Sequence, residues 1–208
     1  MKFVNRTYAI VLARKNSKRI TSKNTILFKN KPLIEWTFEE ARKSKHIFKI
    51  LCSTDDGSII SRYKNLDKIE FPFKRPKYLS KNSTTSEDTI KHLLNFYLKK
   101  NNYLPRNIIL LQPTSPLRTV KHINKSLIKY RQNKCCSLIS ITKISHTYKT
   151  INSRLKKIKN IYKFNGAIFI FDTKKFLNTN KIYQSDCTYF YKMDEKSSLD
   201  LDYPHQLV

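Results

Sequence analysis

Apolar and polar positions follow two different spacings along the chain. Tyr8 to Ala13 form a short apolar run, and Ile50 to Cys52 form another. Between them, residues 33–41 place apolar side chains at helical spacing. A strand, a helix and a second strand in this order predict a βαβ unit, which is the building unit of parallel sheets.

The same alternation continues to residue 171. Ile108 to Leu111 are apolar on both faces, which is typical of a central strand of a parallel sheet with helices on both sides. We expect further strands at residues 69–73, 137–142 and 167–171, and helices around residues 90–97 and 123–130. The pattern predicts a single α/β domain over residues 1–208, with a mostly parallel sheet.

Basic residues dominate the chain, with 42 Lys and Arg against 15 Asp and Glu and a formal net charge of +27. This balance favours an anionic partner, but it does not choose among nucleic acid, nucleotides, phosphates and acidic sugars. Codon usage in an AT-rich genome explains the Lys, Asn and Ile enrichment equally well. Residues 149–163 are especially basic and carry few large apolar side chains, which predicts a solvated connection or hairpin outside the core.

The sequence also bears on the compartment. The N-terminus lacks the apolar segment of a signal peptide, and no apolar run approaches the roughly 18 residues that span a membrane. We therefore expect a cytoplasmic protein without membrane attachment. Cys52, Cys135, Cys136 and Cys187 show no C-x-x-C spacing, and we expect reduced, mostly buried thiols.

A basic loop follows the first predicted strand. Five of the ten residues from Arg14 to Lys23 are basic, more than the chain average of 42 in 208 predicts. Ligands of parallel sheets bind beyond the carboxyl ends of the strands, so this loop is placed to bind a polyphosphate through Arg and Lys side chains and backbone N–H groups. With only two glycines in the chain, the two glycine-rich phosphate-binding fingerprints are excluded. A solvated charged turn is the alternative.

Two later segments are also candidates for chemistry. Leu111 to Arg118 (LQPTSPLR) follows a buried strand, and its two prolines would hold nearby polar side chains stiffly; a plain strand-to-helix connection is the equal alternative. Asp200 and Asp202 face the same side if the segment is extended, so both carboxylates would reach one hard cation such as Mg²⁺. Alternatively, Asp202 caps a helix that has Pro204 in its first turn.

Several motifs occur together and in a fixed order. They are residues 12–24, Ser53-Thr54-Asp55, Arg75-Pro76, the block LQPTSPLRT at residues 111–119, Asn165 to Ile168, and Asp200-x-Asp202. In this combination the chain resembles the acylneuraminate cytidylyltransferases (the CMP-sialic acid synthetases), including relatives that act on pseudaminic and legionaminic acids. The resemblance covers nearly the whole chain.

The resemblance implies a fold, a reaction and a set of site residues. The fold is a Rossmann-like three-layer nucleotide-diphospho-sugar transferase fold. The reaction transfers CMP from CTP to the anomeric hydroxyl of a nonulosonic acid, with Mg²⁺ as cofactor, and gives an activated sugar for surface glycan synthesis. The resemblance assigns Arg14, Ser17, Lys23, Asn24, Arg75 and Ser86 to the nucleotide, Gln112, Thr114, Ser115 and Asn165 to the sugar acid, and Asp200 and Asp202 to the metal. The predicted catalytic residues are Arg14, Lys23 and Asp202.

One segment departs from the family pattern. Relatives carry a longer dimer arm, which here is shortened to about residues 146–164, with Arg154 or Lys163 as candidate substitutes for its basic residues. With this arm shortened, the resemblance allows a homodimer but does not imply one. Two alternatives stay open: a cytidylyltransferase for another acidic sugar such as 3-deoxy-manno-octulosonic acid, and a basic nucleic-acid-binding protein on a degenerate scaffold, although the ordered motifs make nucleic acid a less favoured partner.

Overall fold

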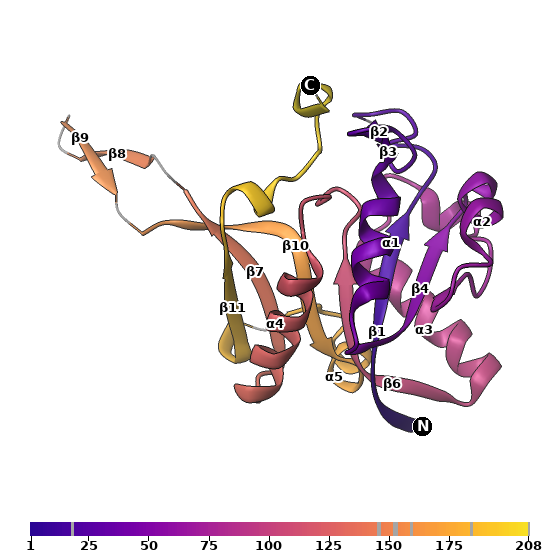
Figure 1. The fold of residues 1–208 in the computed structure, drawn as a ribbon. Helices are drawn as coiled ribbons and strands as arrows, with labels where there is room; N and C mark the ends of the chain where they lie inside the picture. Colours follow the sequence, from indigo (N-terminus) through magenta and orange to yellow (C-terminus); the bar gives the residue numbers. More distant parts are fainter. Residues whose placement is uncertain (18, 145–146, 152–153, 159, 184, 208) are drawn as a thin grey trace.

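A seven-stranded sheet with helices on both faces forms the body of the molecule (Figure 1). The computed structural model describes residues 1–17, 19–144, 147–151, 154–158, 160–183 and 185–207. The sheet strands are β1 (Lys2–Ala13), β4 (Ile47–Thr54), β5 (Ile69–Glu70), β6 (Tyr103–Leu111), β7 (Ser137–Lys143), β10 (Tyr162–Asp172) and β11 (Thr188–Met193). The α-helices are α1 (Leu33–Lys43), α2 (Gly57–Tyr63), α3 (Ser86–Asn101), α4 (Val120–Gln132) and α5 (Thr173–Thr179).

The strand order is β11-β7-β10-β6-β1-β4-β5. Only β10 runs antiparallel to its neighbours, β6 and β7, and the other pairings are parallel. This arrangement confirms the predicted α/β class with a mostly parallel sheet. Two short hairpins lie outside the sheet: β2 (Leu27–Phe28) with β3 (Lys31–Pro32), and β8 (Thr147–Ile151) with β9 (Arg154–Ile158).

The central strand β6 explains why its sequence is apolar at consecutive positions. Ile109 and Leu111 pack into the core on one face with α1, α2 and α4, whereas Ile108 and Leu110 pack on the other face with α3 and α5. Full burial of one such side chain stabilises the fold by about 1.5–3 kcal/mol. The two layers of helices therefore follow from the apolar pattern of one strand.

Two elements at the ends of the sheet differ from the sequence prediction. The strand expected at residues 69–73 is only the two-residue β5, after which Thr54 and Lys74 form an isolated bridge. The edge strand β11 was not predicted. It alternates, with Tyr189 and Tyr191 packed against the core and Phe190 47% exposed between them, so a weak period-two pattern was present.

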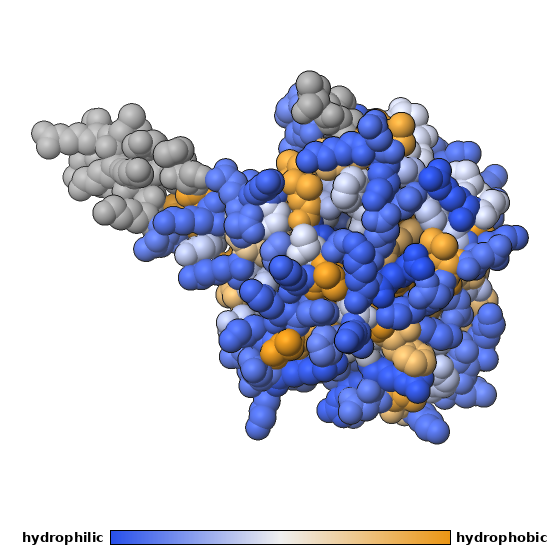
Figure 2. All heavy atoms as spheres, viewed as in Figure 1, coloured by the Kyte–Doolittle hydropathy of each residue, from blue (hydrophilic) through white to orange (hydrophobic). Residues whose placement is uncertain are grey.

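Much of the basic segment around residues 149–163 lies in the β8–β9 hairpin, which is one of the two predicted forms, and its last two residues begin β10. β8 and β9 pair antiparallel and project away from the sheet beyond β7 and β10 (Figure 1). A role of this hairpin as a shortened dimer arm stays a prediction. The face in Figure 2 is mostly hydrophilic with small separate apolar areas, in keeping with the high charge. No helix in the described part of the chain is long and apolar enough to cross a membrane.

The prediction of four reduced thiols is wrong for two of them. Cys136 and Cys187 form a disulfide, with their Cα atoms 5.3 Å apart. The reason is the pairing of β11 with β7: Ser137 lies opposite Thr188, so the residues before them are also neighbours. Without β11, no pattern of residues indicated this contact. Cys52 and Cys135 are free thiols, and burial raises the pKa of Cys52 to about 12.

Replacing Cys187 with serine is expected to destabilise the oxidised protein. The disulfide joins residues 51 apart in sequence, and closing such a loop restricts the unfolded chain. The expected loss is about 3 kcal/mol, which lowers Tm by roughly 6–12 °C for a chain of this size. Calorimetry without reductant measures it, with Cys135→Ser as the matched control. Equal Tm values for the parent and Cys187→Ser would contradict the expectation.

Candidate active site

Three adjoining cavities lie at the carboxyl ends of the parallel strands. The first, of about 180 Å³, is lined by predicted residues from the loop after β1, the start of α3 and the turn after β6: Arg14, Ser17, Lys23, Asn24, Ser86, Gln112 and Thr114. The second, of about 330 Å³, shares Arg14, Lys23, Ser86 and Gln112 and adds Arg75. The third, of about 560 Å³, is lined by Lys143, Lys163, Asn165, Asp200 and Asp202 among others.

The basic loop after β1 is held in place from both sides. The backbone N–H of Lys15 donates to Asp55 Oδ1 over 2.7 Å, and Arg14 Nη1 donates to the Lys81 carbonyl over 3.2 Å. Asn24 Nδ2 donates to the Arg14 carbonyl over 2.8 Å, so this predicted nucleotide contact also fixes the loop. Side-chain and backbone bonds thereby orient the loop toward the first cavity. Lys18 lies outside the described residues.

The two late aspartates lie in different electrostatic surroundings. Asp202 accepts from Lys23 Nζ over 2.6 Å and from Arg19 over 2.9 Å. Asp200 Oδ1 is buried and has no hydrogen-bond partner among the described residues, and burial raises the pKa of this carboxyl. The charge of Asp202 is therefore neutralised by two cations, whereas one buried oxygen of Asp200 accepts no hydrogen bond from the described residues.

The backbone around these aspartates is not extended, which corrects the assumption made from sequence. The N–H of Asp202 donates to the Asp200 carbonyl over 3.1 Å, which closes a tight turn. Leu201 is fully buried, and its N–H donates to the Thr114 carbonyl over 2.8 Å. This anchor keeps both carboxylates on the third cavity. A 3₁₀ helix (Pro204–Leu207) follows, and Gln206 Oε1 accepts from the Asp202 N–H over 2.7 Å.

Arg118 braces the turn after β6, a role that sequence reasoning did not assign. Its guanidinium is fully buried and donates to the carbonyls of Gln112 (3.1 Å) and Ala167 (2.8 Å) and to Thr37 Oγ1 (2.7 Å). Burial lowers the pKa of Arg118 to about 9, so the group stays charged at neutral pH. The available signal was an arginine at the end of a motif that follows a wholly apolar strand.

Asn165 lines the third cavity, but its amide is bonded to the protein. Its Oδ1 accepts from Ser140 Oγ over 2.5 Å, and its Nδ2 donates to Ser198 Oγ over 2.8 Å. The next residue, Gly166, has a φ of +71°, and a Cβ there would lie 3.1 Å from Gln112 Oε1. The Asn165-Gly166 pair thus sets how closely β10 approaches the Gln112 side chain.

Replacing Gly166 with alanine is expected to cost about 1–2 kcal/mol of stability, because an alanine is strained at positive φ. The new methyl would also displace the Gln112 amide. Since the resemblance assigns Gln112 to the acceptor, KM for the acceptor should rise more than KM for CTP. Unfolding and steady-state kinetics measure both effects, with Gly57→Ala as control because a Cβ there meets nothing within 4 Å. An unchanged acceptor KM would contradict the expectation.

Two other predicted residues line the cavities with buried polar side chains, and a third predicted residue does not reach them. Arg75 is buried, and its Nε donates to Ser53 Oγ over 3.0 Å, so its position is fixed beside the second cavity. Thr114 Oγ1 is buried beside the Asp200 carboxyl and acts to lower the pKa of that group, against the larger effect of burial. Ser115 is 1% exposed and is not a lining residue of any of the three cavities, so the structure does not bring it to the site.

The aspartate pair fits a hard divalent cation. Mg²⁺ in nucleotide sites takes one or two carboxylates and completes its coordination with phosphates and water. Asp200 offers a buried oxygen with no partner among the described residues, and Asp202 already attracts the cations Lys23 and Arg19. In the part of the chain that the structure describes, no third His, Cys, Asp or Glu joins them in a metal-binding group. Such a site would therefore depend on ligands from a bound nucleotide.

Comparisons with known proteins agree with this arrangement. The model of the cytidylyltransferase family matches residues 8–207, so the chain belongs to the cytidylyltransferase family. The N-acylneuraminate cytidylyltransferase of Escherichia coli O18:K1:H7 is 30% identical over 93% of the chain and 48% of the relative. The CMP-N,N'-diacetyllegionaminic acid synthase of Legionella pneumophila is 27% identical over 96% of the chain and 92% of the relative. The pseudaminic acid cytidylyltransferase of Campylobacter jejuni is 28% identical over 96% of the chain and 84% of the relative.

The family resemblance found in the motifs is thereby confirmed, although the chain spans about half the length of the N-acylneuraminate relatives. Solved structures confirm the fold. A CMP:2-keto-3-deoxy-manno-octonic acid synthetase complexed with CTP matches with a TM-score of 0.68 at 14% identity, covering 97% of this chain and 95% of that one. A 4-diphosphocytidyl-2C-methyl-D-erythritol synthase matches with a TM-score of 0.70 at 9% identity, covering 98% of this chain and 96% of that one. Both support the Rossmann-like three-layer architecture.

Proposed function

We propose that the chain transfers CMP from CTP to the anomeric hydroxyl of a sialic-acid-like nonulosonic acid and releases pyrophosphate. The observation that carries the proposal is the ion pair between Lys23 and Asp202, 2.6 Å long, which joins the basic loop to the aspartate segment. Lys23 lines the first two cavities and Asp202 lines the third. The names of the relatives supply the substrate class.

The first two cavities fit CTP. Arg14 and Lys23 are placed to offset the charge of the triphosphate, and this charge grows on the leaving pyrophosphate as the bond to the α-phosphorus breaks. Arg75 and Ser86 line the second cavity, where we place the cytosine. Bound Mg²⁺ would be held by Asp200 and Asp202 and would supply further charge neutralisation and alignment of the phosphates.

The third cavity fits the acceptor. Gln112 lines the first two cavities but lies at the border of the third, because a Cβ on Gly166 would lie 3.1 Å from Gln112 Oε1 and 3.6 Å from Asp200 Oδ2. Lys143 and Lys163 add positive charge to its wall, which suits the carboxylate of a nonulosonic acid. Lys163 is thus a candidate for the basic group that relatives take from a longer arm, whereas the Arg154 side chain lies outside the described residues. An acceptor hydroxyl here would attack the α-phosphorus, and a carboxylate of the aspartate pair would take its proton. We expect such a CTP-dependent enzyme in the cytoplasm.

The test is pyrophosphate release from CTP and Mg²⁺ with four acceptors: N-acetylneuraminic, legionaminic, pseudaminic and 3-deoxy-manno-octulosonic acids. We expect release with one of the first three and its loss in Asp202→Ala. Release only with the fourth would replace the proposed acceptor class. No release with any acid, together with oligonucleotide binding that CTP does not displace, would overturn the proposal in favour of a nucleic-acid-binding protein.

A further inference from the structure

A fourth cavity, of about 550 Å³, lies at the opposite edge of the sheet from the candidate active site. Its lining comes from the first half of β1, the start of β6, the end of α4 and the α5 region, near the bottom of Figure 1. Four cationic side chains line it: Arg106, Arg131, Lys134 and Lys175. Asp172 is the one acidic residue among the described lining residues.

The charge of this cavity is not compensated by ion pairs. Across the described ranges, no carboxylate lies within ion-pair distance of any of the four cations. Arg131 makes a long hydrogen bond of 3.4 Å to Thr7, and the Asp172 carboxylate accepts from the backbone N–H of Lys175. A concave surface with a surplus of cations concentrates anions from solution.

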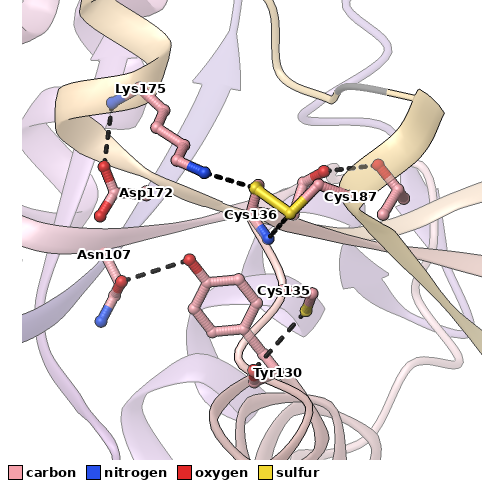
Figure 3. The surroundings of a disulfide bond; sticks show 9 residues. Asn107, Tyr130, Cys135, Cys136, Asp172, Lys175 and Cys187 are labelled. Atoms are coloured by element: carbon pink, nitrogen blue, oxygen red, sulfur yellow. Dashed lines mark hydrogen bonds between the residues drawn. A yellow bond between two sulfur atoms is a disulfide. The ribbon is translucent and has the colours of Figure 1, made fainter.

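The wall of the same cavity contains sulfur. Cys136, one half of the disulfide with Cys187, is a lining residue, and Lys175 Nζ lies 2.5 Å from its Sγ (Figure 3). A cation at this distance attracts an incoming thiolate and stabilises a Cys136 thiolate once it forms. Cys135 also lines the cavity as a free thiol whose Sγ lies 3.6 Å from the Tyr130 carbonyl. Burial raises the pKa of Cys135, so it is poorly suited to act as the nucleophile.

We propose that this cavity, the sulfur cavity, binds an anionic low-molecular-weight thiol and that the Cys136–Cys187 disulfide exchanges with it. Neither feature alone points to this ligand class. A cationic cavity takes any small anion, and a disulfide that is reached through a cavity reacts with any thiol that enters it. Their coincidence in one cavity selects thiols that also carry negative charge.

The exchange balances in two steps. The thiolate of the ligand attacks Sγ of Cys136, which forms a mixed disulfide, and Cys187 leaves with the bonding electrons and takes a proton from water. A second thiolate attacks the ligand sulfur of the mixed disulfide, and Cys136 leaves as a thiolate beside Lys175. Two thiols are oxidised to one small disulfide, and the protein disulfide is reduced to two thiols. The proposal does not depend on the cytidylyltransferase activity.

The test compares thiols of different charge as reductants of the oxidised full-length protein. Mercaptoethanesulfonate and glutathione are the anionic probes, 2-mercaptoethanol the neutral one and cysteamine the cationic one. Each rate, followed by alkylation and mass spectrometry, is divided by the rate of the same thiol toward hydroxyethyl disulfide. We expect the normalised rates of the anionic thiols to exceed that of cysteamine by about 10-fold or more at low ionic strength. The difference should shrink at high salt.

Variants locate the effect. Arg131→Gln combined with Lys134→Gln removes two cations of the sulfur cavity, and we expect the charge preference to fall severalfold. Lys121→Gln, in the first turn of the same helix and not a lining residue, is the matched control and should keep the preference. Cys135→Ser should also keep it. All four positions are exposed side chains or a free thiol, and circular dichroism checks that each variant folds.

Three results would overturn the proposal. The first is equal normalised rates for anionic and cationic thiols. The second is a charge preference that Lys121→Gln reduces as much as the double variant does. The third is a protein that, under oxidising conditions, is alkylated at all four cysteines, because it would then contain no disulfide to exchange.

Discussion

Replacing Asp200 with asparagine is expected to lower kcat for CMP transfer by about 10³-fold, because a metal ion contributes several kcal/mol of charge stabilisation and each 1.36 kcal/mol is tenfold in rate. The amide is nearly the same size as the carboxylate but offers a hard cation no negative charge. Mg²⁺ should therefore bind more weakly, and raising its concentration should recover only part of the activity.

The same change is expected to leave the metal-free protein at least as stable as the parent. Burial raises the pKa of the Asp200 carboxyl, so the folded protein holds a proton at pH values where the unfolded chain has released it. Stability of the parent consequently falls as the pH rises through the window above the ordinary aspartate pKa. An asparagine is neutral throughout, so the variant should equal the parent below this window and exceed it above.

Both halves of the prediction are measurable on one preparation. Pyrophosphate release over a Mg²⁺ titration gives the activity, and denaturant unfolding in EDTA between acidic and neutral pH gives the stability. Asp186→Asn, at an exposed carboxylate in the short 3₁₀ helix Ser185–Cys187, is the control and should change neither. A variant that loses activity and also unfolds more easily at neutral pH would contradict the argument, because Asp200 would then be stabilising the fold.

Much of the fold was predictable because it rests on local patterns. The run from Ile108 to Leu111 identified the central strand, and helical spacing identified α1, α3 and α4. The edge strand β11 was missed because exposed Phe190 and half-buried tyrosines resemble a polar surface segment as much as a strand. The disulfide was missed for the same reason, since only the pairing of β11 with β7 brings Cys187 to Cys136.

The candidate site was predictable from its motifs as a set of residues but not as a set of contacts. Residues of three distant segments line adjoining cavities. The hydrogen bonds that occupy Asn24 and Asn165, however, depend on tertiary neighbours that no spacing reveals. Arg118 shows the same limit: the sequence assigned it no role, and only the structure shows that it lies in the interior and holds the turn after β6.

Arg118→Met is the second change with a large expected effect. Methionine fills much of the volume and removes a buried charge, which is favourable. It leaves two buried acceptors, the Ala167 carbonyl and the Thr37 hydroxyl oxygen, without the N–H donor that the guanidinium supplied. The Gln112 carbonyl is less affected, because Thr37 Oγ1 lies 3.4 Å from it and the Ser115 N–H also donates to it. Each buried group left unpaired costs about 1–3 kcal/mol. The unpaired groups should outweigh the relief of charge, and we expect a net loss of about 2–4 kcal/mol.

The functional cost follows from what Arg118 connects. Its hydrogen bonds to the carbonyls of Gln112 and Ala167 connect the turn after β6 to β10, and β10 comes close to the Gln112 side chain at Gly166. A displacement of about 1 Å at a positioned group lowers the rate about 10²-fold. The loss should appear in kcat and in KM for the acceptor, with KM for CTP nearly unchanged, because Arg14 and Lys23 lie on a loop that Arg118 does not contact.

Arg118→Lys and Arg42→Met separate positioning from general destabilisation. Lysine keeps the charge but not the planar fork, so it should recover less than half of the lost activity. Arg42 forms an exposed ion pair with Asp67, and its loss should cost no more than about 1 kcal/mol and leave the kinetics unchanged. If Arg118→Met, assayed well below its Tm, raised KM for CTP and acceptor equally, the brace would act on the whole fold. A selective rise for the acceptor means that a buried cation, which lines none of the three cavities, sets the geometry of the acceptor cavity.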